Sequence, residues 1–200
     1  MTLNYNNNSV NDVKFNGDDV EILQFNGITV WERYTPPVVL FESSAPGNYS
    51  LTLTKPTACS VVVVGGGAAG TSYSFIQKYG GGSGACVYGT TTLPAGTYSI
   101  SVGGGSVKPS GTSSATAGGY SSITQGNIFI ISVEGGKSHE YNKAGKGGNT
   151  FNITDETGLT KVNGNDASSS SGGSSVYNGY GKGGNYDQNG DPGYIKIETI

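Results

Sequence analysis

Glycine makes up 35 of the 200 residues, and most of it occurs in short runs. These runs lie at residues 65–67, 80–82, 103–105, 118–119, 135–136, 147–148, 172–173 and 183–184. Each glycine loses much backbone freedom on folding and has no side chain to bury. A folded chain of this kind must therefore use the backbone itself as packing material. Extended threefold helices of the polyproline-II type can do this, because without side chains nothing holds their backbones apart.

Short apolar runs between the glycines predict an all-β fold. Turn signals such as Pro46-Gly47 and Gly126-Asn127 fall where hairpins need them, and evenly spaced strands are typical of a β-sandwich or jelly-roll-like sheet pair. We therefore predict such a sandwich with packed polyglycine segments, and a helical turn or two only at residues 74–79. Strands are expected near residues 38–42, 48–54, 59–64, 86–93, 97–102, 121–124, 128–133, 150–154 and 194–198.

The first 35 residues differ from the rest because they contain a ten-residue repeat. Phe15-Asn16-Gly17 recurs as Phe25-Asn26-Gly27, and Asn-Gly between alternating residues is a strong hairpin signal. The repeat predicts a small β-meander with strands near residues 12–15, 20–25 and 28–33.

This meander defines a predicted N-terminal domain of residues 1–35, followed by a glycine-rich β domain of residues 36–200. Three short strands are barely stable alone. We therefore expect residues 1–35 to serve attachment or oligomerisation, with Phe15, Phe25 and Trp31 as the apolar anchors. In the alternative, these strands are a first sheet of the same domain.

Charge and hydropathy exclude several classes of function. The formal net charge is −3, and the eleven Lys and Arg residues form no basic stripe, so we expect no nucleic-acid partner. No run approaches the roughly 20 apolar residues of a membrane helix, so we expect no membrane insertion. Residues 1–8 have neither the basic start nor the apolar core of a signal peptide. We expect a chain made in the cytoplasm without one.

One segment matches a cofactor motif by its letters. In residues 61–70 a β-run is followed by glycines with the G-x-G-x-x-G spacing of a dinucleotide site. That site also needs a following helix and an acidic residue about 20 positions on. No helix is expected, because residues 71–73 lead into another glycine run by residue 80, and no Asp or Glu occurs between Glu42 and Glu134. We expect no cofactor.

Other sets of catalytic or metal-binding residues are incomplete. His139 is the only histidine and lies in a polar stretch without a nucleophile elbow nearby. Cys59 and Cys86 can be a pair or two free thiols, and they do not have the spacing of a metal site.

Acidic residues offer two further possibilities. Residues 187–191 carry Asp, Asn and Asp in alternation and can form part of a calcium loop, but the later acidic ligand is missing, so a turn is favoured. The carboxylate pairs Asp18-Asp19 and Asp155-Glu156 lie in turns, outside any visible glycosidase cleft. We therefore predict no metal site, and a protein that is not an enzyme.

Tyrosine is the side chain left with the chemistry to bind a partner. There are thirteen tyrosines, several of them in glycine-rich loops, and tyrosine offers a stacking face and a hydroxyl at low entropic cost. In the alternative, the rings cover the glycine helices as a lid. The candidate binding residues are Tyr73, Phe75, Tyr79, His139, Tyr141, Tyr177, Tyr180 and Tyr186.

The order of these features resembles the glycine-rich domain of bacteriophage tail-fibre and tail-tip proteins, from about residue 37 to the end. The Phe-Asn-Gly repeat with Val30-Trp31 likewise resembles the N-terminal segments of phage structural proteins. The segments that carry the resemblance of the glycine-rich part are residues 39–52, 61–67, 93–105 and 190–197, the last of which contains Pro-Gly-Tyr.

The resemblance implies a non-enzymatic virion protein of the tail fibre or tail tip, in which polyglycine helices present loops to the host. Its implied partners are a bacterial surface receptor (a glycan or an outer-surface protein), other tail proteins of the virion, and copies of itself, with a trimer favoured. The alternatives are a purely structural virion component and a tail enzyme that degrades capsule or another glycan.

Overall fold

Two compact units follow one another along the chain in the computed structural model, residues 1–37 and residues 38–200. No helix in the described part of the chain is long and apolar enough to cross a membrane. The structure describes residues 4–5, 8–9, 13–15, 18–20, 22–25, 28–32, 35–72, 78–108, 116–140, 143–151, 153 and 157–200.

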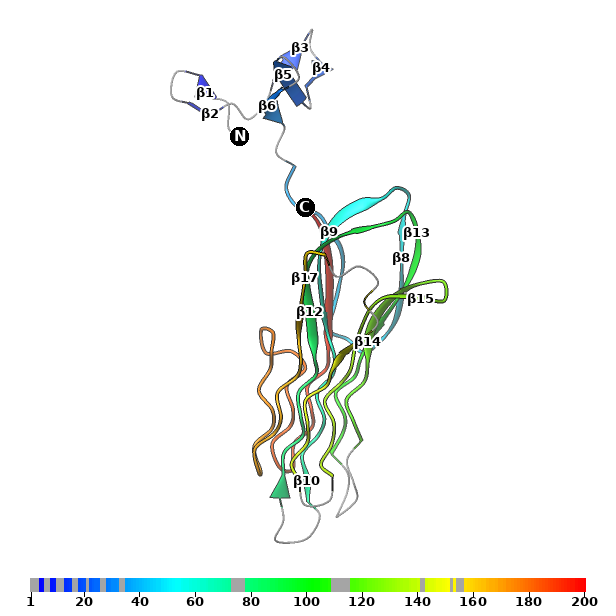
Figure 1. Ribbon diagram of the computed structural model, residues 1–200, viewed down its shortest axis with the longest axis vertical. Helices are drawn as coiled ribbons and strands as arrows, with labels where there is room; N and C mark the ends of the chain where they lie inside the picture. Colours follow the sequence, from blue (N-terminus) through cyan, green and yellow to red (C-terminus); the bar gives the residue numbers. More distant parts are fainter. Residues whose placement is uncertain are drawn as a thin grey trace. The chain divides into compact units, whose positions relative to one another are not determined.

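The unit of residues 1–37 contains three antiparallel strand pairs (Figure 1). Their registers leave residues 6–7, 16–17 and 26–27 between the paired strands, so the hairpins repeat every ten residues. The predicted first strand of the meander pairs with residues 18–19 instead of with the predicted second strand. The pairs are β1 (Asn4–Tyr5) with β2 (Asn8–Ser9), β3 (Lys14–Phe15) with β4 (Asp18–Asp19), and β5 (Ile22–Phe25) with β6 (Ile28–Glu32).

The unit of residues 38–200 contains two antiparallel sheets of five strands, which confirms the predicted all-β sandwich (Figure 1). The first sheet has the order β17 (Leu159–Val162), β12 (Cys86–Leu93), β9 (Thr57–Val64), β18 (Tyr194–Thr199), β7 (Val39–Ser43). The second sheet has the order β16 (Thr150–Phe151), β15 (Ile128–Val133), β14 (Ser121–Gln125), β13 (Gly96–Val102), β8 (Gly47–Leu53).

Two details differ from the sequence prediction. Strand β17 was missed, because Leu159-Thr160-Lys161-Val162 carries only two apolar residues. The expected helical turn at residues 74–79 is wrong in its described part, where Lys78–Tyr79 forms a strand. Residues 74–77 lie outside the described residues.

The apolar core lies between the two sheets and follows from strand alternation. Successive side chains of a strand point to opposite faces, and β-branched residues suit this half-buried surface. Val61 and Val63 of β9 therefore face Ile100 and Ile123 of the second sheet, and all four are fully buried. Val64, on the other face of β9, is also buried, in a separate small cluster with Cys86 and Tyr194.

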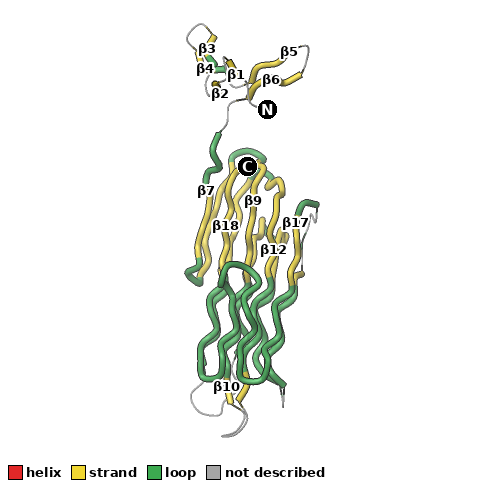
Figure 2. Tube along the Cα trace, turned by 90° about the vertical axis from the view of Figure 1, so that its left-hand side faces the viewer, coloured by secondary structure: helices red, strands yellow, loops and turns green. Residues whose placement is uncertain are grey.

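Below the sheets, the strands continue as wavy glycine-rich segments that lie side by side (Figure 2). We call this part the glycine bundle. Its hydrogen bonds run between segments, and in segment 65–70 every third backbone N–H donates to the same neighbour, which is the period of a polyproline-II helix. The donors at positions 65 and 68 go to segment 80–85, those at 67 and 70 to segment 188–191, and that at 66 to Gly119.

Segment 80–85 repeats the pattern and is surrounded on all sides. Six segments bond it: 65–68, 134–137, 145–148, 163–165, 169–173 and 181–184. Every residue of 61–71 and of 80–87 is buried. The centre of the bundle is therefore a core of backbone, which confirms the prediction of packed polyglycine.

The glycines of the bundle are required by the closeness of neighbouring backbones. A Cβ on Gly66 would overlap the carbonyl of Gly104, and one on Gly81 would overlap the carbonyl of Ala68. Gly104 is in the run 103–105 but is not restricted in this way, because a Cβ there would make ordinary contact with Pro46 at 3.5 Å. The sequence shows the glycine run but not which of its members faces another backbone.

Buried serine hydroxyls bond backbone groups where the sheets meet the bundle and within the bundle itself. Ser121 donates to the carbonyl of Val64 and accepts from the N–H of Gly103. Ser106 accepts from the N–H of Ala69, and Ser83 accepts from that of Asn165. These hydroxyls replace backbone partners where the threefold pattern is interrupted, so buried polar groups remain satisfied.

Candidate functional site

The end of the glycine bundle far from the sheets gathers most of the described candidate side chains. We call it the tip, and the label of the short strand β10 (Thr71–Ser72), which pairs with β11 (Lys78–Tyr79), marks it in Figure 2. The chain reverses direction here, where the glycine segments end in polar residues whose side chains do not have to fit between neighbouring backbones. The other described residues of the tip are 107–108, 138–140, 168–171 and 185–189.

Tyr79 and His139, two candidates from separate parts of the sequence, meet at the tip. Their rings are stacked, with centroids 5.4 Å apart and planes 4° from parallel. His139 is 8% exposed, and this burial lowers the pKa of its imidazole from the ordinary value. The polar stretch that carries His139 therefore holds a buried side chain, packed against Tyr79.

Charged groups surround a second aromatic ring at the tip. The Lys78 ammonium lies 4.7 Å from the centroid of the Tyr186 ring, a cation–π contact. Lys108 pairs with Asp187 at 3.0 Å, and its backbone N–H donates to Asn189. Asp187 and Asn189, considered above for calcium, are thus both bonded to Lys108. The tip presents aromatic faces, ammonium groups and amides on a rigid base.

Tyr177 and Tyr180 lie elsewhere, on the outer face of the first sheet. Tyr180 stacks on Tyr194 with centroids 4.1 Å apart, and Tyr177 contacts the ring of Tyr88. Tyr194 donates to Glu42 at 2.8 Å, and burial, followed by this hydrogen bond, raises the pKa of its phenol. These rings cover the sheet, and the turn that carries Tyr177 and Tyr180 is separate from the tip.

The remaining candidates cannot be placed in the same way. Tyr73, Phe75 and Tyr141 lie outside the described residues. Phe15, Phe25 and Trp31 belong to strands β3, β5 and β6, but only their backbone is described.

The glycines of residues 61–70, which match the spacing of a dinucleotide site, pack within the glycine bundle in this structure. The N–H groups of residues 65, 67 and 70, which would hold a pyrophosphate, donate instead to neighbouring segments of the bundle. Strand β10 follows these glycines where a dinucleotide site would have a helix.

The two cysteines lie on opposite faces of the first sheet. On β9, Cys59 is opposite Thr91 of β12, whereas Cys86 of β12 is opposite Val64. The two cysteines are therefore five positions out of register along the paired strands, and both thiols are free. Burial raises the pKa of the Cys86 thiol to about 12, which leaves it protonated and unreactive.

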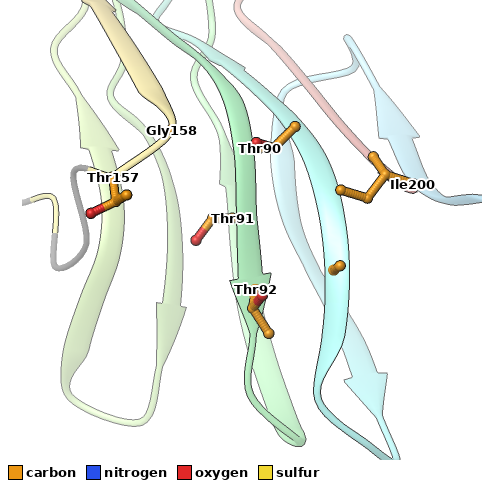
Figure 3. Close-up of a pocket in the computed structure, with 7 residues that line it drawn as sticks. Thr90, Thr91, Thr92, Thr157, Gly158 and Ile200 are labelled. Carbon is orange, nitrogen blue, oxygen red and sulfur yellow. The ribbon is translucent and has the colours of Figure 1, made fainter. Parts of the chain in front are cut away.

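A shallow depression of about 280 Å³ lies far from the tip, beside the C-terminal residue (Figure 3). The side chains of its described lining carry hydroxyl and apolar groups. The lining residues are Ala58, Thr90, Thr91, Thr92, Thr157, Gly158 and Ile200.

A sequence profile described as a glycine-rich domain matches residues 43–199, a span that covers the glycine bundle and almost all of both sheets. The chain belongs to the glycine-rich domain family. No curated protein sequence matches it. The glycine-rich domain of this chain is thus the whole sandwich together with its bundle, and the tip is one end of that domain.

Sequence reasoning missed the ionic contacts of the tip. Lys78, Lys108 and Asp187 have no local signal, because each partner comes from a segment about 80 or more residues away. The only sequence clue to these contacts is the alternation of glycine segments, because each pair of segments places the residues between them at the tip.

Proposed function

We propose that this chain is a bacteriophage tail-fibre or tail-tip protein whose glycine-rich domain binds a receptor on the bacterial surface. The observation that carries the proposal is the tip. A bundle with a backbone core ends in stacked Tyr79 and His139, in Tyr186 beneath Lys78, and in the Lys108–Asp187 pair. The order of strands and glycine runs, which resembles that of tail-fibre proteins, supports the same proposal.

A rigid base gives such side chains a binding advantage. Ordering flexible groups on association costs about 0.5–1.5 kcal/mol for each side chain that is immobilised. At the tip the rings are already held by stacking and cation–π contacts, so less of this cost remains. Tyrosine, histidine and lysine together suit a glycan or a polar protein loop, through stacking and hydrogen bonds. The receptor-binding residues proposed are therefore Tyr79 and Tyr186, with the buried His139 supporting the ring of Tyr79.

Residues 1–35 have a separate role in this proposal. They attach the chain to other tail proteins of the virion or join it to copies of itself, with a homotrimer favoured. Removing them should leave a folded glycine-rich domain, because residues 38–200 have their own core. Light scattering of the full and shortened chains tests this; a full chain that is monomeric and binds no virion protein contradicts it.

Binding of the purified, fluorescently labelled chain to a panel of Gram-negative and Gram-positive strains tests receptor binding. We expect at least one strain to be labelled, and Tyr186→Ala and Tyr79→Ala to reduce labelling by about tenfold, as expected for the loss of an aromatic contact. Tyr88→Ala is the matched control, because Tyr88 is a partly exposed ring on the first sheet, outside the tip. Absence of labelling on all strains would favour a structural virion component, and release of reducing sugar from the cells would favour a tail enzyme.

A further inference from the structure

The outer faces of the two sheets differ in chemistry. The first sheet exposes Glu42, Lys196 and Glu198, and Tyr177 and Tyr180 cover part of it. The outer face of the second sheet is uncharged along three neighbouring strands, and we call this part the hydroxyl face. Its residues are Asn48, Ser50 and Thr52 of β8, Thr97, Ser99 and Ser101 of β13, and Ser122 and Thr124 of β14.

Strand register places these side chains in rows. Asn48, Ser101 and Ser122 are directly opposite one another, and Ser50, Ser99 and Thr124 form the next row. Adjacent strands are about 4.8 Å apart, so the three strands form a grid about 10 Å across. The hydroxyls of Ser50, Ser99, Ser101 and Ser122 make no hydrogen bond to another described residue, and so remain available to donate and accept.

An ordered aromatic ring borders the grid. Tyr120 precedes β14, is 57% exposed and makes an edge-to-face contact with Phe151 of β16, with centroids 5.6 Å apart and planes 88° apart. Phe151 lies beside Ser132, which continues the row from Ser122. On the first sheet the corresponding aromatic ring, Tyr194, is covered by Tyr180 of the same chain, whereas no described residue covers Tyr120 in this way.

We infer that the hydroxyl face, with Tyr120 as its stacking platform, binds an uncharged polysaccharide chain. Sugar hydroxyls both donate and accept, as Ser and Thr do, and the apolar face of a pyranose ring stacks on an aromatic ring. The absence of charged side chains among the residues of the hydroxyl face selects a neutral chain over an anionic one. Glu134, which follows β15, is engaged by Asn149 and Lys137. Rows of hydroxyls that continue over three strands suit an extended chain lying across the strands, whereas a single terminal sugar needs a pocket.

Affinity electrophoresis of the full chain in gels that contain dextran, soluble starch or hyaluronate tests this inference. We expect at least one of the neutral polymers, dextran or starch, to retard the wild-type chain more than hyaluronate does. Tyr120→Ala and Ser101→Glu should weaken this retardation by about tenfold, the equivalent of one lost stacking contact or one misplaced charge. Thr160→Glu is the control, because it adds the same charge to the exposed outer face of the first sheet.

Several outcomes would overturn the inference. These are no retardation by either neutral polymer, stronger retardation by hyaluronate, or equal retardation of the wild-type chain and the two face variants. A wild-type dimer that Ser101→Glu dissociates in sedimentation would show that a second copy covers the face instead. Melting temperatures check that the variants fold. If the Ser101→Glu variant does not fold, Ser99→Glu is used in its place. Tyr186→Ala separates this surface from the tip, because it should lower cell labelling and leave retardation by polysaccharide unchanged.

Discussion

The sandwich and the glycine bundle are built from the same chain segments, but their cores differ in kind. In the sandwich, side chains such as Ile100, Ile123 and Val63 fill the space between two sheets. In the bundle, the buried residues of 65–70 and 80–85 have at most a methyl or hydroxymethyl side chain, and backbones fill the space. Val63 is the last residue of β9 in the sandwich core and Gly65 begins the bundle, so only Val64 separates the two cores along the chain.

This difference reverses the expected response to mutation. A side-chain core loses stability when atoms are removed, because a cavity remains and dispersion contacts are lost. A backbone core has little to remove, but an added Cβ meets a neighbouring carbonyl and must push a hydrogen-bonded segment away. The sandwich should therefore be sensitive to truncation and the bundle to enlargement.

Truncation in the sandwich should have the largest effect. Ile123→Ala removes a fully buried side chain from the centre of the core and should lower the free energy of unfolding by about 3–4 kcal/mol, within the usual range for such cavities. Ile128→Ala, on the next strand but 61% exposed, should cost less than about 0.5 kcal/mol. Urea unfolding of both variants measures the difference, and equal losses would contradict a core centred on Ile123.

Enlargement in the bundle should rank second. Gly81→Ala places a methyl group against the carbonyl of Ala68 and should cost about 2–3 kcal/mol, as overpacked sites do. Gly104→Ala is the matched control: its Cβ meets Pro46 at an ordinary 3.5 Å, so the change should be neutral or slightly stabilising through the unfolded chain. If both variants melt alike, the glycine segments are not packed as described. Slow amide exchange at residues 80–85 gives an independent check.

The sequence predicts the sandwich well and the bundle only in outline. Alternation in runs such as residues 96–102 determines which side chains face inward, so most strands were predicted nearly to the residue. Glycine runs predict packed threefold helices, but such helices have no side-chain pattern that would identify their neighbours. The free space at Gly104 and the meeting of Tyr79 with His139 depend on this lateral order, which only the structure gives.

Substitution at the boundary between the two cores should lower the free energy of unfolding less than substitution within either core. Ser121 bonds Val64 and Gly103 at the point where the strands become glycine segments. Ser121→Ala leaves a buried carbonyl and a buried N–H with one partner fewer, and should cost about 1–2 kcal/mol. Ser122→Ala, the next residue on the outer face, should change stability by less than about 0.5 kcal/mol. Equal melting temperatures for the two variants would show that the sheets and the bundle are not coupled through this hydroxyl.

The smallest effect is expected at the tip, where the backbone core ends and a titratable side chain is buried. Burial lowers the pKa of His139 below its ordinary 6.5, so between these two values the unfolded chain binds more protons than the folded one. The contribution of His139 to stability should therefore be fully present above about pH 6.5 and fall as the pH drops towards the lowered pKa.

His139→Gln removes the titration but keeps a side chain of similar polarity, and provides the control. The difference in melting temperature between the wild-type chain and this variant should shrink as the pH falls from 7.5 to 5. The protection factor of the Tyr79 amide, which corrects for the intrinsic slowing of exchange at lower pH, should fall over the same range in the wild-type chain alone, because the Tyr79 ring stacks on His139. A difference that grows at acid pH would mean that the imidazolium is stabilised in the folded tip. In that case the tip would differ from the rest of the bundle, since it would favour a charge next to the backbone core.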